Sequence, residues 1–178
     1  MVEDVLQLAR LEEVAGLRES VPVDMAVMAR ACAKDFALVT AERKQKMALE
    51  LPEDDLPPVT GDPALLRRVL DNLAHNAVEH NPAGGTVTIG VAAEGADVRV
   101  SVSDCGPGIP PEARGDIFVK FFQRDVKRHV GNVGLGLALC RKVVHRHGGA
   151  IGIEDAKPRG ACFYFLLPGE QPELISPN

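Results

Sequence analysis

An alternation of apolar with other residues between positions 87 and 102 restricts the fold more than any other feature. The apolar members are Val87, Ile89 and Val91 in one stretch and Val98, Val100 and Val102 in the next. Because successive side chains of a strand point to opposite faces, the two stretches predict a hairpin with one buried face, closed by a loop at residues 94–97. A two-stranded hairpin is marginal alone, so other elements must cover that face.

Apolar residues at helical spacing predict helices that can cover the apolar face of this hairpin. One helix is expected over residues 24–46 with Asp24 as N-cap, and another begins at Asp62-Pro63, where an acid caps and a proline takes the first position. A third, around residues 135–147, ends at a Gly-Gly pair. We also expect an N-terminal helix over residues 2–14, a short helix at 110–118, and strands at 47–51, 151–154 and 161–167.

Composition excludes several classes of function. The 178 residues carry a net charge of −5 with 4% aromatics and no Trp, which argues against a nucleic-acid partner. No apolar run is long enough to span a membrane, and the four cysteines are far apart in sequence, which argues against a zinc site or a disulfide framework. These observations predict a reduced, cytoplasmic chain.

The end of the second predicted strand carries an acid on the apolar side. Asp104 continues the alternation of Val98, Val100 and Val102, so its carboxylate is aimed at the core, where it is costly unless something binds it. Gly106 and Gly108 follow and allow close approach to the backbone. Either Asp104 caps a turn, or it accepts a proton from an amine of a buried planar ligand.

Two further constellations are weak when taken singly. Asn72, Asn76 and His80 recur every four residues, so they share one stripe of a helix. An amide on this stripe either bonds a neighbouring loop or offers its oxygen to a hard cation such as Mg²⁺. Residues 131–137 (GNVGLGL) form a glycine-rich start to the third helix, which can bind phosphate, and Arg128 belongs to a basic run just before it.

In their order along the chain, these motifs resemble the ATP-binding catalytic domain of sensor histidine kinases, in the wider gyrase, chaperone and mismatch-repair ATPase superfamily. The matching segments are residues 71–77 (DNLAHNA, the N box), 104–109 (DCGPGI, the first glycine box), 117–122 (IFVKFF, the F box) and 134–138 (GLGLA, the second glycine box). The resemblance covers residues 62–168.

The resemblance implies an α/β two-layer sandwich, the Bergerat ATP-binding fold, with a mixed sheet and about three helices on one face. It implies the end of a dimerisation helix and a linker at residues 1–21, the catalytic domain at 22–168 and a flexible tail at 169–178. ATP and Mg²⁺ are the implied cofactors, with Asn76 as metal ligand and catalytic residue and Asp104 as the adenine-binding carboxylate. The other implied nucleotide contacts are Asn72, His80, Gly106, Gly108, Ile109, Phe118, Arg128, Gly134, Leu135, Gly136 and Leu137.

The implied activity is transfer of the γ-phosphoryl group of ATP to a histidine on a dimerisation domain, followed by signalling to a response regulator. The full-length protein is expected to be a homodimer, and whether it is membrane-anchored stays open. Two alternatives remain at this stage. A non-catalytic module is suggested by Glu79 and Val133, which depart from the usual pattern, and the other alternative is an ATP-hydrolysing switch. The hydrolase reading is disfavoured because Asn72 stands where relatives carry a water-activating Glu.

Overall fold

The computed structural model describes residues 20–119 and 136–170. Its elements follow one another as a short strand, a helix, two strands, a long helix, a hairpin, a 3₁₀ turn, a helix and a closing hairpin. They are β1 (Val21–Val23), α2 (Met25–Glu42), β2 (Lys46–Glu50), β3 (Val59–Gly61), α3 (Pro63–His80), β4 (Thr86–Glu94), β5 (Asp97–Ser103), η1 (Pro111–Ala113), α4 (Gly136–Arg146), β6 (Ala150–Asp155) and β7 (Ala161–Pro168).

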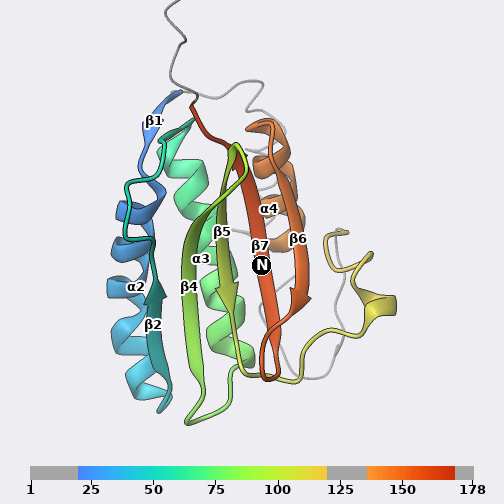
Figure 1. Cartoon of the computed structure of the whole chain (residues 1–178). Coiled ribbons are helices and arrows are strands. Elements are labelled where there is room, and N and C mark those ends of the chain that lie inside the picture. The colour runs from blue at the N-terminus through green and yellow to red at the C-terminus, as the bar shows by residue number, and fades with distance from the viewer. Residues whose placement is uncertain (1–19, 120–135, 171–178) are drawn as a thin grey trace, which may run out of the picture.

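Five strands form one mixed sheet in the order β2-β4-β5-β7-β6 (Figure 1). The predicted hairpin is its centre, where β4 and β5 pair antiparallel with Val91 opposite Val100. Strand β2 joins β4 in parallel, and the remaining pairs are antiparallel. A separate two-stranded ladder pairs β1 with β3. Side-chain alternation along β5 then sends Val98, Val100 and Val102 into the core, where each is fully buried.

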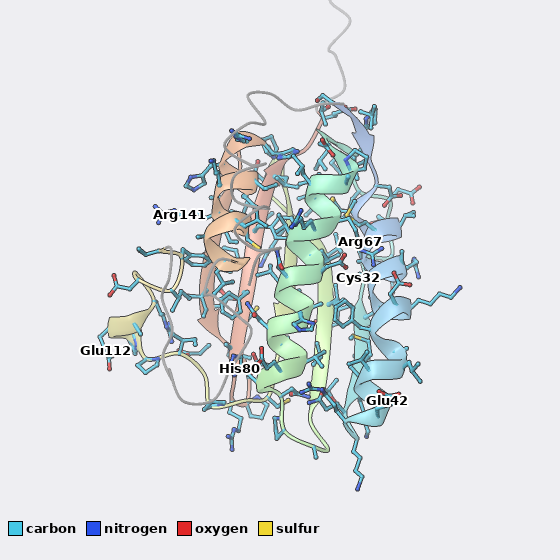
Figure 2. All side chains as sticks on the ribbon, turned by 180° about the vertical axis from the view of Figure 1, so that it is seen from behind. Cys32, Glu42, Arg67, His80, Glu112 and Arg141 are labelled. Atoms are coloured by element: carbon cyan, nitrogen blue, oxygen red, sulfur yellow. The ribbon has the colours of Figure 1, made fainter. Side chains whose placement is uncertain are left out.

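Helices α2, α3 and α4 lie side by side on one face of the sheet, which confirms the two-layer arrangement (Figures 1 and 2). Helix α3 is the middle of the three and presents Leu66, Leu70 and Leu73 to the core, all fully buried. The guanidinium of Arg67 joins it to α2, because Nη2 bonds Asp35 at 2.5 Å while Nε bonds Asp71 at 2.7 Å. The site residues on α3 therefore rest on a packed support.

Both long helices begin as the sequence predicts. The Asp24 carboxylate accepts hydrogen bonds from the backbone of Ala26 and Val27, and that of Asp62 accepts from Ala64 and Leu65. A side-chain oxygen thus satisfies amides that the first turn of a helix leaves without partners.

Other expectations need correction. The expected short helix at 110–118 is reduced to the 3₁₀ turn Pro111–Ala113, and the first long helix ends at Glu42 because Lys46 already begins β2. The ladder of β1 and β3 was not predicted. Residues 2–14 lie outside the described part. Within residues 20–119 and 136–170, no helix is both long enough and apolar enough to cross a membrane.

A buried histidine ties the start of α3 to the end of α4. Nε2 of His147 accepts a hydrogen bond from the Asp62 backbone N–H at 3.0 Å, so the ring proton lies on Nδ1, 2.8 Å from the Val143 carbonyl oxygen that accepts it. Gly61 leaves room for the ring, since a Cβ there would lie 2.6 Å from Cδ2 of His147.

We predict that His147→Leu lowers the free energy of unfolding by about 1–3 kcal/mol, because the buried Asp62 N–H loses its acceptor. Urea denaturation measures the change. His145→Leu, on the exposed side of the same helix, is the matched control and should change stability little. Equal effects of the two substitutions would contradict the role assigned to His147.

Candidate functional site

The predicted polar stripe lies along α3, beside the start of α4. Asn72 and Asn76 are half-buried. His80 is exposed and lies at the end of the helix (Figure 2). A Cβ built at Gly136, the first residue of α4, would lie 3.6 Å from Oδ1 of Asn72. The Asn72 Nδ2 is buried, and the same amide lies close enough to the Cys140 thiol to lower its pKa through a hydrogen bond, against the larger opposite effect of burial.

Asp104 follows β5 and is held at the bottom of a glycine-rich loop. The residue is 5% exposed, and its Oδ1 accepts from the Gly106 N–H at 2.7 Å and from the Ala161 N–H at 3.4 Å. Burial raises the pKa of this carboxyl, while the two backbone hydrogen bonds and the nearby charge of His80 act in the opposite direction. The structure therefore places a desolvated acid where the sequence predicts one.

Two glycines permit the close packing around this acid. A Cβ at Gly106 would lie 2.7 Å from the carbonyl oxygen of His80, so the loop meets the end of α3 directly. At Gly160, with φ of +116°, a Cβ would lie 1.9 Å from the carbonyl oxygen of Asp104. No other residue fits either position without moving backbone.

Two arginines that the sequence analysis missed hold the same loop from outside. Nε of Arg114 donates to the carbonyl oxygen of Ile109 at 3.0 Å, and the same guanidinium pairs with Asp155. Nε of Arg159 donates to the carbonyl oxygen of Gly106 at 3.3 Å. No local pattern predicts these contacts, because each depends on a partner from another part of the chain.

A third missed residue is Asn81, which follows α3. Its Oδ1 accepts from the backbone N–H of Cys105 at 2.9 Å, next to Asp104. In the sequence, Asn81-Pro82 only indicates where the helix stops. The Sγ of Cys105 lies 3.4 Å from the carbonyl oxygen of Thr86, as suits a small residue in a tight turn.

The remaining predicted residues lie in the core, at its edge, or outside the described part of the chain. Phe118 is buried in the core, where it packs edge-on against Phe163 with ring centroids 6.3 Å apart. Ile109 and Leu137 are partly buried against that core, and Gly108 approaches Gly160. The structure thus brings Asn72 to Gly136, and Asp104 to Gly106 and His80. Arg128, Gly134 and Leu135 lie outside the described residues.

Comparison with known proteins decides the family. A sequence profile for the histidine kinase-, DNA gyrase B- and HSP90-like ATPases matches residues 61–171. The chain belongs to this family. This ATPase domain is similar to the adaptive-response sensory kinase SasA of Gloeothece citriformis, with 41% identity over 130 residues that cover 71% of this chain and 32% of SasA. It spans about a third of the length of the curated relatives it matches.

Solved histidine kinases share its fold. Full-length ShkA in complex with AMPPNP matches with a TM-score of 0.83 and 34% identity, over 96% of this chain and 35% of ShkA. The nucleotide-free catalytic domain of the histidine kinase ThkA matches with a TM-score of 0.75 and 31% identity, over 85% of this chain and 96% of ThkA. The chain is a histidine kinase catalytic domain by family and by fold, which confirms the resemblance; the roles of single residues stay predictions.

The raised pKa of Asp104 predicts how this kinase domain responds to pH. A carboxyl whose pKa is higher in the folded state than its ordinary 3.8 contributes stability only while protonated, and this contribution is lost as pH rises through the raised value. We therefore expect nucleotide-free Asp104→Asn to be at least as stable as the parent at pH 7, since the amide can still accept from Gly106. The difference in the free energy of unfolding between the variant and the parent should become smaller as pH falls toward 4. Urea denaturation at several pH values measures this difference. A variant that is less stable at pH 7, by an amount that pH does not alter, would contradict this.

Proposed function

We propose that the domain binds Mg-ATP along α3, with the adenine at Asp104 and the phosphates at the start of α4, and donates the γ-phosphoryl group to a histidine of a dimerisation domain. The observation that carries this proposal is the buried carboxylate of Asp104, with its loop packed against the end of the helix that bears Asn76. A desolvated acid beside glycine backbone suits the exocyclic amine of adenine, because a hydrogen bond to a charged acceptor is among the stronger ones.

The phosphate end of the proposed site rests on two independent features. Helix α4 has 11 residues, and its N-terminus favours negative charge. The side chain of Asn72 lies beside this end of α4, with its Oδ1 3.6 Å from a Cβ built at Gly136, so its amide is close enough to meet a phosphate group there. In the proposed arrangement Gly134, Leu135, Gly136 and Leu137 approach the phosphates, with Arg128 nearby, while His80 flanks the adenine.

The amide oxygen of Asn76 is a suitable protein ligand for Mg²⁺. The amide of this half-buried residue offers an oxygen, the ligand type that the ion prefers, and Mg²⁺ characteristically takes few protein ligands while it keeps phosphates and waters. Within the described ranges, three or more His, Cys, Asp or Glu side chains nowhere gather into a candidate metal cluster. When bound, Mg²⁺ would neutralise phosphate charge, and Asn76 would be the protein side chain that holds it.

The chain's own residues act by binding and orientation, as is general for phosphoryl transfer. Asp104 and His80 fix the base, Asn72 orients a phosphate oxygen, and the start of α4 stabilises negative charge. The acceptor histidine nitrogen forms a bond to the γ-phosphorus while the bond from phosphorus to the leaving oxygen breaks, and ADP departs with that electron pair. A response regulator as the next acceptor, a homodimeric full-length kinase and a cytoplasmic location belong to the same proposal.

We predict that Asp104→Asn weakens the binding of Mg-ADP by about 2 kcal/mol, roughly 30-fold, because the amide loses the charge that strengthens the hydrogen bond to adenine. Calorimetric titration of the folded variant measures the change. Asp116→Asn, the same substitution at an exposed residue, should keep the parental affinity. Unchanged affinity in the first variant would remove Asp104 from the pocket.

Incubation with γ-labelled ATP tests the activity. We expect no acid-labile label on this chain alone, and label on a separately supplied dimerisation domain that carries its histidine. Asn76→Ala should abolish that transfer, whereas His75→Ala, its exposed neighbour on α3, should not. Acid-labile label on the chain alone would refute this expectation. Rapid phosphate release that Glu79→Gln eliminates would instead indicate a hydrolase.

A further inference from the structure

Asn81 connects the helix of the proposed metal site to the loop of the proposed adenine site. The residue is 5% exposed, and its Oδ1 accepts from the Cys105 backbone N–H at 2.9 Å. Cys105 directly follows Asp104, and Asn76 stands five positions before Asn81. One side-chain hydrogen bond therefore joins the two halves of the site.

The same junction is closely packed on its other side. The carbonyl oxygen of His80 leaves no space for a Cβ at Gly106, and the Oδ1 of Asp104 accepts from the Gly106 N–H. The backbone of residues 104–106 thus rests on the last turn of α3. A shift of this loop would move the Asp104 carboxylate relative to the helix.

Asn81 is itself held in place. Nε2 of Gln45, which is also buried, donates to the carbonyl oxygen of Asn81 at 2.5 Å and to that of Val78 at 3.0 Å. A Cβ at Gly85 would lie 2.7 Å from Oδ1 of Asn81, so the neighbouring turn encloses the amide. Because only the amide oxygen can accept from the Cys105 N–H, this bond also fixes which way the side chain faces.

We propose that Asn81 is a positioning residue for the nucleotide site, which sets the location of Asp104 relative to Asn76. Five residues of helix correspond to about 7.5 Å along its axis, so the spacing between the base and the metal depends on where the loop meets the helix end. The inference rests on the proposed function, because it requires Asp104 to bind adenine. Asn81 acts through Asp104 and does not itself touch the nucleotide.

The test is a double-substitution cycle between Asn81 and Asp104, read as the affinity for Mg-ADP. Asn81→Leu keeps the approximate volume and removes the acceptor, and Asn81→Ser is a smaller second variant in case the first does not fold. Loss of one positioning hydrogen bond should weaken binding about five-fold in the parent. In the Asp104→Asn background the same substitutions should have little effect, because the group they position is already disabled.

A destabilised control separates positioning from general loss of structure. Val59 is fully buried and pairs with Val23 in the ladder of β1 and β3, which precedes the start of α3 and so lies at the other end of that helix from Asn81, and Val59→Ala therefore perturbs the fold away from the site. It should lower stability without altering Mg-ADP affinity. The Asn81 variants should also reduce the preference for Mg-ADP over Mg-GDP, a ratio that stability alone does not change.

The possible outcomes separate the positioning role of Asn81 from the proposed binding of adenine by Asp104. Asn81 substitutions that weaken binding equally in both backgrounds, or leave affinity and base preference unchanged, overturn the positioning role while Asp104 keeps its own. If Asp104→Asn alone leaves affinity unchanged, the proposed adenine site fails, and the inference about Asn81 fails with it.

Discussion

Helix α3 is fixed at both of its ends by buried polar contacts, and the site depends on that double attachment. At its start the Asp62 backbone N–H bonds His147, and just beyond its end Asn81 bonds the backbone of Cys105. The apolar face between these ends is packed against the sheet. Hydrophobic burial holds a helix against a sheet without fixing its position along the axis, because it is non-directional. The hydrogen bonds at the two ends are directional, so they fix the position of α3 along its axis.

The Asp104 carboxylate shows how stability and binding are opposed in one group. Its burial raises the pKa and favours the neutral form, so ionisation of this carboxyl opposes folding. The same burial strengthens a hydrogen bond once an amine partner arrives, because the local dielectric constant is low around a residue that is 5% exposed. The backbone donors of Gly106 and Ala161 limit the cost, so the acid is retained in position before ligand binds.

Features that depend on a local signal could be predicted from the sequence. Asp62 with Pro63 predicts a helix start from two adjacent residues, and the alternation before Asp104 predicts a buried acid from one strand. Contacts that join distant segments could not be predicted, because pairs such as Asn81 with Cys105, or Arg159 with Gly106, leave no periodic pattern. The expected helix at 110–118 failed for another reason, since prolines that can open a helix were followed here by only one 3₁₀ turn. The nucleotide roles came from motif order and resemblance, and the positions of Arg128, Gly134 and Leu135 are not described.

Because the three helices lie on one face, the two faces of the sheet tolerate substitution differently. On the face toward the helices, Val98 and its neighbours on β5 are fully buried, so a change of even one methylene alters the packing. On the opposite face, which no helix of the described residues covers, Arg99 pairs with Glu94 and Glu154 and lies 3.9 Å over the ring of Tyr164. Exposed pairs of this kind are worth about 0–1 kcal/mol each. Substitutions on that side should therefore change stability little, whereas substitutions on the side toward the helices disturb the packing that supports α3.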